Sequence, residues 1–278
     1  MKIFKNKVAV ITGAASGIGR AIADRCAQEG MKVVLADIEQ AALNQAEQEL
    51  KSGGAEVLAV RTDVSSADSV EVLAQKALKQ FGEVHLLFNN AGVGAGGTVW
   101  DSTIADWQWV VGVNLWGVIH GIRAFMHLML AQDTPCHIVN TASIAGLIPY
   151  HPSSPYHVTK HAVVALTENL YYSLAQRQAK VKVSVLCPGL INTRILESER
   201  NRPVEYMNPQ LQQIVTPEAQ FLQTEIRKAL ETSMAPDQLA GIVFGAIREE
   251  KFYILSGPEF NPTIQQRMEN ILAGRNPS

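Results

Sequence analysis

The chain has 278 residues, 47% of them hydrophobic, and a formal net charge of −2 at pH 7. This length can bury one large α/β core without a second domain, and the charge balance excludes the basic surface of a nucleic-acid or membrane-surface binder. No apolar run reaches the ~18 residues of a membrane span, and a first strand from residue 7 argues against a signal peptide.

The cysteines and histidines show no metal-binding or disulfide pattern. Cys26, Cys136 and Cys187 are scattered and form no Cys-x-x-Cys pair, so we expect reduced core residues in a cytoplasmic protein. The seven histidines include no His-Glu-x-x-His spacing, and we therefore expect no metal site.

Short aliphatic runs that predict strands alternate along the chain with periodic stretches that predict helices. The expected strands are 7–12, 32–37, 56–61, 84–89, 136–141, 181–187 and 252–255. The expected helices are 18–29, 39–51, 67–80, 105–131, 155–178 and 237–249. This alternation predicts a single α/β domain over 1–278, a Rossmann-type doubly wound parallel sheet of about seven strands with helices on both faces.

The first strand runs directly into a glycine-rich turn that contains Gly13, Gly17 and Gly19. Glycines let the backbone approach a pyrophosphate closely, and the N-terminus of the following helix then faces the phosphate charge. The order of strand, glycine turn and helix predicts a dinucleotide-binding loop, with Ser16 and Ile18 beside the glycines. A plain tight turn between strand and helix is the alternative.

Asp37 ends the second expected strand, about twenty residues after the glycine loop. Its carboxylate would accept hydrogen bonds from the adenosine ribose hydroxyls and would repel a 2′-phosphate. An NADP enzyme is expected to carry a basic residue near Ser16 or Ile38, and neither is basic. We therefore expect NAD as the cofactor, with NADP as the alternative, and we assign the nearby Arg20 to a salt bridge.

Tyr156 and Lys160 lie four residues apart in the helix expected over 155–178. Residues at this spacing share one face of a helix, so the phenol and the ammonium can share a site. A nearby cation lowers the pKa of a phenol from its ordinary value near ~10, and an oxidised nicotinamide would lower it further. The pair is a candidate proton-transfer site, although Tyr-x-x-x-Lys also occurs by chance on surface helices.

Six motifs in order and spacing resemble those of the short-chain dehydrogenase/reductase family. They are Thr12-Gly13-x-x-x-Gly17-x-Gly19, Asn89-Asn90-Ala91-Gly92, Asn114, Ser143, Tyr156-x-x-x-Lys160 and Pro188-Gly189. The resemblance runs from about residue 7 to residue 253. It implies an oxidoreductase that interconverts a secondary alcohol and a ketone with a nicotinamide cofactor.

The resemblance also implies a role for each catalytic residue. Tyr156 would exchange the hydroxyl proton, and Ser143 would hydrogen-bond the same substrate oxygen. Lys160 would lower the pKa of the Tyr156 phenol and hold the nicotinamide ribose. Asn114 would anchor a water chain from Lys160 to solvent, whereas a lone Asn within a helix is otherwise more often a packing detail.

The remaining family motifs imply cofactor contacts. Asp63-Val64 resembles an adenine contact, although Ser65 or Ser66 could equally cap the next helix. Thr193 would meet the nicotinamide carboxamide. The complete expected set is Gly13, Ser16, Gly17, Ile18, Gly19, Asp37, Asp63, Val64, Asn90, Ala91, Gly92, Tyr156, Lys160, Pro188, Gly189 and Thr193.

Three segments are expected to wall the substrate pocket: 93–97, 144–151 and a lid insertion over 190–235. The lid is far longer than a normal connection, and its prolines 203, 209 and 217 favour short helices. Glycines in the first segment and apolar residues in the second favour a bulky, mostly uncharged substrate. Arg194, Arg200 and Arg202 could bind a carboxylate, but the adjacent Glu197, Glu199 and Glu205 favour surface salt bridges.

Other residues are assigned to packing or to subunit contacts. His157 and His161 are expected to pack or face a subunit, and Trp100, Trp107, Trp109 and Trp116 to lie in the core or an interface. The family resemblance implies a homo-oligomer, a dimer or a tetramer, through the helices at 105–131 and 155–178. A C-terminal extension over 256–278 carries Ile264, Met268 and Ile271 at helical spacing and would pack on a partner or cover the site.

Two other classes of function stay open from the sequence. A non-catalytic dinucleotide sensor is disfavoured because Ser143, Tyr156 and Lys160 are all present. An epimerase or dehydratase of the extended relatives is disfavoured because 278 residues leave no room for a larger C-terminal substrate domain.

Overall fold

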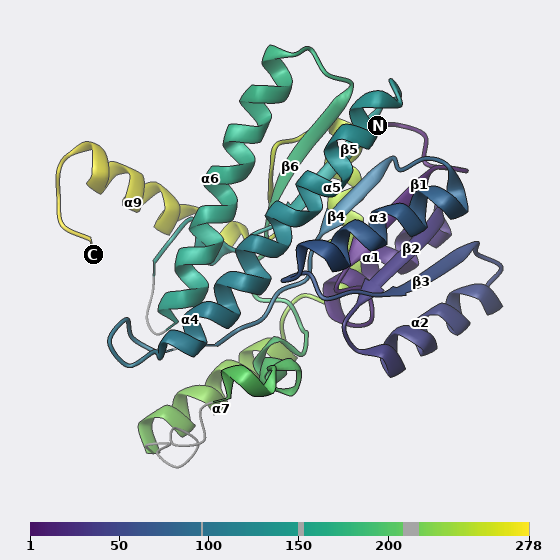
Figure 1. Ribbon diagram of the computed structural model, residues 1–278. Coiled ribbons are helices and arrows are strands. Elements are labelled where there is room, and N and C mark those ends of the chain that lie inside the picture. Colours follow the sequence, from purple (N-terminus) through teal and green to yellow (C-terminus); the bar gives the residue numbers. More distant parts are fainter. Residues whose placement is uncertain (96, 150–152, 208–216, 278) are drawn as a thin grey trace.

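Seven parallel strands form one sheet at the centre of the molecule (Figure 1). The computed structural model of the protein describes residues 1–95, 97–149, 153–207 and 217–277, with the backbone alone for 217–223. The sheet order is β3-β2-β1-β4-β5-β6-β7, which confirms the predicted Rossmann-type doubly wound fold. The strands are β1 Val8–Thr12, β2 Lys32–Asp37, β3 Val57–Arg61, β4 Leu86–Asn89, β5 Cys136–Thr141, β6 Val181–Cys187 and β7 Tyr253–Leu255.

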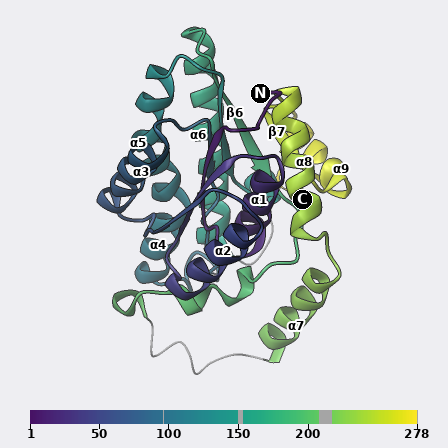
Figure 2. The ribbon, with the colours of Figure 1, turned by 90° about the vertical axis from the view of Figure 1, so that its right-hand side faces the viewer.

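Helices cover both faces of the sheet, as the views in Figure 1 and Figure 2 show. α1, α2 and α8 lie on one face, whereas α3, α4, α5 and α6 lie on the other. The helices are α1 Gly17–Gln28, α2 Gln40–Ser52, α3 Ala67–Phe81, α4 Ile104–Val111, α5 Gly117–Ala131, α6 Ser154–Gln176, α7 Pro217–Glu231, α8 Pro236–Glu249 and α9 Asn261–Leu272.

Alternate residues of each central strand enter opposite hydrophobic cores. In β1, Ala9 and Ile11 pack in the core under α1 and α8, whereas Val8 and Val10 pack in the core under α3 and α5. Every residue of β1 is buried, which explains why the strands appear in the sequence as continuous aliphatic runs. The bounds of the elements agree with the predicted ranges to within two residues at each end.

The helix predicted over 105–131 is one continuous rod with an irregular middle. α4 passes into a π-helical turn, Gly112–Trp116, and then into α5. Gly117 and Gly121 pack closely on the sheet side: a Cβ on Gly117 would lie 2.8 Å from Val64 Cγ2, and one on Gly121 would overlap the Asn89 amide. Among the described residues only this helix, Ile104–Ala131, is long and apolar enough to span a membrane, and these contacts make it a core helix.

The lid region contains two 3-10 turns and α7. The turns are η3 Ile195–Asn201 and η4 Val204–Tyr206. The predicted short helices are present: Pro203 directly precedes η4 and Pro217 begins α7, while Pro209 lies outside the described residues. Figure 2 shows α7 standing clear of the sheet.

The C-terminal extension begins beside the sheet and then runs outward. Its 3-10 turn η6, Pro258–Phe260, leads into α9, which forms where the helical spacing of its apolar residues predicted a helix. Ile271 and Leu272 remain 58% and 88% exposed, so little of this helix is buried by the chain itself. Figure 1 shows α9 on the α6 side of the molecule.

Candidate active site

A cavity of about 690 Å³ opens at the carboxyl ends of the strands, between the sheet and the lid. The turns after β1, β4, β5 and β6 contribute to its wall, together with the ends of β2 and β3, the start of α6, and η3. Of the predicted site residues, all line this cavity except Gly19 and Asn114, which lie behind its wall. Residues from across the chain are thus brought to one place.

The glycine loop needs glycine for conformational and steric reasons. Gly13 and Gly17 have φ values of +65° and +55°, in the left-handed region that side chains disfavour. At Gly19 a Cβ would overlap the Gly13 carbonyl oxygen, so only glycine lets α1 begin so close to β1. Ser16 occupies the N-cap position of α1 but makes no side-chain capping bond, and it lines the cavity.

Asp37 ends β2 with its carboxylate held by backbone donors. The Oδ2 atom accepts from Ala15 N at 2.9 Å, and Oδ1 accepts from Glu39 N at 3.0 Å. Burial raises the pKa of the Asp37 carboxyl above its ordinary value, while these two N–H groups act in the opposite direction. The carboxylate is therefore fixed in direction at the side of the cavity next to the glycine loop.

Asp63 and Val64 line the same end of the cavity. The Asp63 Oδ1 atom accepts from both Ser65 N, at 2.9 Å, and Ser65 Oγ, at 2.7 Å. The N-cap of α3 is Ser66, whose Oγ accepts from Ser69 N at 3.3 Å. Capping of the helix therefore belongs to Ser66, and Asp63 shapes the turn before it.

The turn after β4 is tied to the glycine loop by Thr12. Its Oγ1 atom accepts from Asn90 N at 2.9 Å and from Ala91 N at 3.0 Å. In return, Asn90 Nδ2 donates to Thr12 O at 3.1 Å. A Cβ on Gly92 would lie 3.5 Å from Lys160 Nζ, so this glycine leaves room for the lysine.

Asn114 lies inside the π-helical turn and is fully buried. Its Oδ1 atom accepts from Val93 N at 2.8 Å, and its Nδ2 atom donates to Val93 O at 2.9 Å and to Thr159 Oγ1 at 3.3 Å. Local widening of a helix of this kind is common at functional sites. Asn114 thus joins the wall segment at Val93 to α6, and its role in a water chain stays a prediction.

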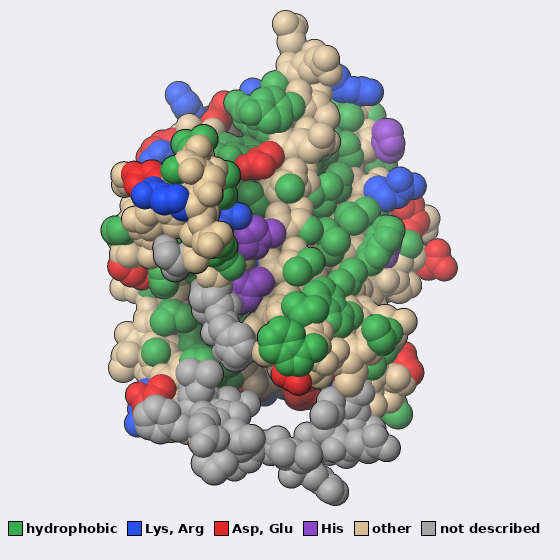
Figure 3. Space-filling model, turned by 90° about the vertical axis from the view of Figure 1, so that its left-hand side faces the viewer, with side chains coloured by type: hydrophobic (Ala, Val, Ile, Leu, Met, Phe, Trp, Pro, Cys, Tyr) green, Lys and Arg blue, Asp and Glu red, His purple; other side chains and the backbone are tan. Residues whose placement is uncertain are grey.

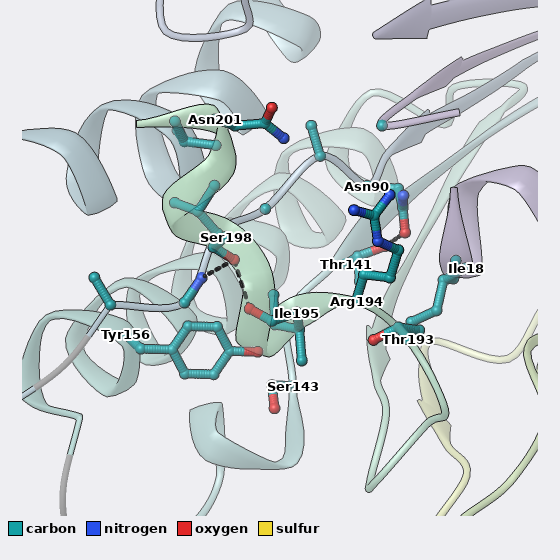
Figure 4. A pocket seen from close by; sticks show the side chains of 18 of the residues that line it. Ile18, Asn90, Thr141, Ser143, Tyr156, Thr193, Arg194, Ile195, Ser198 and Asn201 are labelled. Atoms are coloured by element: carbon teal, nitrogen blue, oxygen red, sulfur yellow. Dashed lines mark hydrogen bonds between the residues drawn. The ribbon is translucent and has the colours of Figure 1, made fainter. Parts of the chain in front are cut away.

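Ser143, Tyr156 and Lys160 meet at the floor of the cavity. Ser143 is the N-cap of the 3-10 turn Ile144–Gly146, and Figure 4 shows the Tyr156 hydroxyl on the same side as the Ser143 hydroxyl. Lys160 Nζ lies 5.4 Å from the centre of the Tyr156 ring and donates to Thr141 O at 3.0 Å. The hydroxyls of Ser143 and Tyr156 and the Lys160 ammonium thus line one part of the cavity, which makes them a candidate proton-transfer site.

Lys160 is nearly excluded from water, with 3% of its surface exposed. Burial lowers the pKa of its ammonium from 10.5 to about 8. The group is therefore still mainly a cation at neutral pH, but one that can lose its proton within a moderately alkaline range. Such a perturbed pKa in a cleft is typical of functional sites.

The segment after β6 joins the cofactor loop to the lid. The Thr193 methyl group rests on the glycine loop, because a Cβ on Gly17 would lie 3.1 Å from Thr193 Cγ2. Pro188 O accepts from Ile144 N at 2.8 Å, and a Cβ on Gly189 would come within 3.0 Å of the Phe260 ring. The start of the C-terminal extension therefore packs on the edge of the site.

The other end of the cavity is mainly apolar. Val93, Trp109, Ile195, Leu196 and Tyr206 contribute to this wall. Parts of two predicted wall segments, Gly96 and residues 150–152, lie outside the described residues. Among the described residues, no group of three His, Cys, Asp or Glu side chains could hold a metal ion.

Two predictions about individual residues were wrong. His157, expected to pack or to face a subunit rather than the substrate, lines the cavity. Trp109 also lines the cavity, but it is 3% exposed and belongs to a hydrophobic cluster, as predicted for a core residue. Arg202 is not a surface residue: its side chain is 6% exposed and pairs with Asp106 of α4 while its guanidinium lies 5.0 Å from the Trp109 ring. Arg20 forms the predicted salt bridges, with Asp24 and Glu49.

Sequence reasoning missed the residues that hold the lid down. Ser198 Oγ accepts from Gly94 N at 2.9 Å and donates to Ile195 O at 2.6 Å (Figure 4). Arg200 Nη2 and Asn201 Nδ2 both lie 2.8 Å from Glu39 Oε1, next to Asp37. No local pattern predicts the pairing of Ser198 with Gly94 or of Arg200 and Asn201 with Glu39, because the partners are about 100 to 160 residues apart in the chain.

Comparison with known proteins gives consistent matches. The family model "short chain dehydrogenase" matches residues 7–204. A "CLA biosynthesis dehydrogenase/reductase" from Lactiplantibacillus plantarum is 37% identical over 273 residues, which cover 98% of this chain and 95% of the relative. A "1-deoxy-11-beta-hydroxypentalenate dehydrogenase" from Streptomyces exfoliatus is 32% identical over 269 residues, 96% of this chain and 89% of the relative. The crystal structure of a short chain dehydrogenase/reductase from Burkholderia phymatum in complex with NAD has a TM-score of 0.96 and 46% identity, and the match covers 100% of this chain and 98% of that one.

Proposed function

Because this chain belongs to the short-chain dehydrogenase/reductase family, we propose that it is an NAD-dependent enzyme that interconverts a bulky, largely apolar secondary alcohol and its ketone. Membership of the family makes the chain an oxidoreductase acting on a CH–OH group. The observation that carries the finer proposal is the convergence of Ser143, Tyr156 and Lys160 with the glycine loop and Asp37 in one cavity.

The residues present fit a dinucleotide. Gly13 and Gly17 supply a close backbone approach at the N-terminus of α1, and Asp37 supplies a fixed carboxylate for ribose hydroxyls. When bound, the nicotinamide accepts or supplies the hydride. The preference for NAD is supported by Asp37, by Glu39 beside it, and by the NAD in the Burkholderia phymatum relative.

The side chains around the substrate oxygen have distinct tasks in this proposal. The Tyr156 phenolate takes the hydroxyl proton of the alcohol, or the phenol donates it to the ketone in the reverse direction. Ser143 hydrogen-bonds the same oxygen and holds it within reach. Lys160 stabilises the phenolate as a buried cation, with its own direction set by Thr141 O.

The size and polarity of the proposed substrate follow from the side chains at the apolar end of the cavity. Trp109, Ile195, Leu196 and Tyr206 offer ring and aliphatic surface, and the paired charges of Arg202 and Asp106 lie behind Trp109. Apolar walls with few polar groups favour a bulky, uncharged body around the reacting carbon. A relative named for a hydroxypentalenate supports an alcohol as the reactive group.

The test is a panel of secondary alcohols of increasing apolar bulk, with NAD⁺ and with NADP⁺, followed at the absorbance of the reduced nicotinamide. We expect turnover with NAD⁺ that improves with bulk. A protein that reduces neither cofactor with any alcohol, and oxidises neither reduced cofactor with any ketone, would contradict the proposal.

A second copy of this chain is the proposed partner. Trp116, Val158, Tyr171 and Tyr172 are large apolar residues of the helical layer between 112 and 176, and they stay 45–71% exposed. Figure 3 shows hydrophobic side chains gathered over this face. Light scattering of the purified protein should give a dimer or tetramer mass, and a monomer would overturn this assignment.

The free, buried cysteines support a cytoplasmic location.

A further inference from the structure

Arg194 is a lid residue that lies in the cofactor half of the cavity. It directly follows Thr193, whose methyl group rests on Gly17 of the glycine loop. Arg194, Thr193 and Ile18 all line the cavity, and Figure 4 shows the Arg194 side chain on the side of the lid where Ile18 and Asn90 lie. The guanidinium is therefore placed beside the loop that would hold a diphosphate.

Few cations are available at this position. Among the described residues that line the cavity, the only Lys and Arg side chains are Lys160, Arg194 and Arg200. Lys160 is buried beside Tyr156, and Arg200 is held by Glu39 at 2.8 Å. Arg20, one turn into α1, is held by Asp24 and Glu49 and does not line the cavity. Arg194 is thus the cation placed to meet the charge of a diphosphate.

Arg194 forms an exposed ion pair with Glu197, which a stronger anionic ligand can replace. Its Nε atom lies 2.7 Å from Glu197 Oε2, in a pair whose side chains are 52% and 43% exposed. Water-exposed pairs of this kind contribute little, whereas a guanidinium and a diphosphate form strong paired hydrogen bonds. Glu197 does not line the cavity, so the exchange would leave its carboxylate in solvent.

We propose that Arg194 is the lid's ligand for the cofactor diphosphate and leaves Glu197 to bind it from the side opposite the glycine loop. This inference rests on the proposed function. Arg194 is the N-cap of the 3-10 turn that contains Ile195 and Ser198, which line the substrate end of the cavity. Binding of the diphosphate by Arg194 therefore also fixes the position of this turn.

The test is calorimetric titration of wild type, Arg194→Ala, Arg194→Lys and Lys228→Ala with NAD⁺, ADP and adenosine. Arg194→Ala should weaken NAD⁺ and ADP binding by about 10- to 100-fold and leave adenosine unchanged. Arg194→Lys keeps the charge and should retain more affinity for both. Lys228 is the matched control, because it forms an i,i+3 pair with Glu225 at 2.9 Å on lid helix α7 and does not line the cavity.

Glu197→Gln separates the proposed contact from a purely structural role of the pair. If Arg194 binds the diphosphate, freeing it from Glu197 leaves ADP affinity unchanged or increases it. If Glu197→Gln weakens ADP as much as Arg194→Ala does, the pair merely braces the lid and the inference is overturned. Wild-type ADP affinity in Arg194→Ala overturns it as well. A wild-type protein that binds neither NAD⁺ nor ADP would instead contradict the proposed function itself.

Discussion

The two walls of the cavity are built on different physical principles. On the sheet wall, Asp37 and Lys160, with Asn114 directly behind them, are buried and held by hydrogen bonds to the backbone. On the lid wall, Arg194 and Arg200 are held by side-chain carboxylates in partly exposed ion pairs. Buried bonds fix direction, whereas exposed ion pairs exchange partners readily.

This difference indicates a division of work. Proton transfer needs reacting groups held in one geometry, and the sheet wall provides it. Entry and release of cofactor and substrate need a wall that opens, and elements with few buried contacts open at low cost in free energy. Substitutions in the sheet wall should therefore change chemistry and cofactor choice, whereas those in the lid should change mainly binding.

The largest effect is expected from Tyr156→Phe, which keeps the ring and removes the proton carrier. Turnover should fall by about 10²- to 10⁴-fold, the range for a lost acid–base group, while NAD⁺ affinity stays close to wild type. Steady-state kinetics and calorimetry measure the two quantities. Tyr253→Phe, on β7 with the residue 49% exposed and outside the cavity lining, is the control and should keep its activity. Near-normal turnover in Tyr156→Phe would remove the phenol from the mechanism.

A change of cofactor preference is expected from Asp37→Ser. Wild type should use NAD⁺ with a kcat/KM about 10² or more above that for NADP⁺, because the carboxylate repels a 2′-phosphate. The substitution should raise NADP⁺ use and lower NAD⁺ use, and adding Ile38→Arg should shift the ratio further. Asp68→Asn, an exposed carboxylate of α3, should leave the ratio as it is. A wild type that prefers NADP⁺ would show that Asp37 does not face the ribose.

A pH-dependent gain in stability is expected from Lys160→Met. Because burial lowers the pKa of Lys160 from 10.5 to about 8, the unfolded chain holds this proton more tightly than the folded protein. The resulting destabilisation is fully present below pH 8 and disappears as the pH approaches 10.5. Lys160→Met should therefore raise the free energy of unfolding by about 3 kcal/mol at pH 7, offset by about 1 kcal/mol for the lost bond to Thr141, and lose this gain in alkali.

Denaturant titrations at pH 7 and near pH 10.5 measure the difference in unfolding free energy between Lys160→Met and wild type. Lys182→Met, at an exposed position of β6, should change the unfolding free energy little at either pH. A Lys160→Met variant that is less stable than wild type at pH 7 would contradict this expectation. It would mean that contacts within the protein already offset the free-energy cost of burying the Lys160 ammonium.

The smallest effect is expected in the lid. Ser198→Ala removes the hydroxyl that accepts from Gly94 N and so loosens the contact between the lid and the substrate wall. KM for the alcohol should rise about 2- to 10-fold with kcat nearly unchanged, as for one neutral hydrogen bond. Ser233→Ala, which removes a hydroxyl that donates to Leu230 O at the end of the lid, is the control. A large fall in kcat instead would place the lid within the chemical machinery.

The sequence by itself determined the sheet, the helices and the group of residues that meet at the cavity. Aliphatic runs and helical periods are local, and the sheet of parallel strands follows from their alternation. The glycines at 13, 17 and 19 could also be interpreted locally, because they stand directly between a buried strand and a helical pattern. Since parallel strands end at the same edge, Asp37, Asn90 and Ser143 necessarily approach one another.

Only the tertiary structure decided which side chains hold the lid and face the substrate. Glu39 pairs with Arg200, 161 residues away in the chain, and Asp106 pairs with Arg202, 96 residues away, beside the Trp109 ring. The same arginines have acidic neighbours in sequence, so local pattern alone favours the wrong partners for Arg200 and a surface position for Arg202. Which way His157 and Trp109 point depends on how α4 and α6 rotate against the sheet. Such choices depend on packing between distant segments, and no short stretch of sequence encodes them.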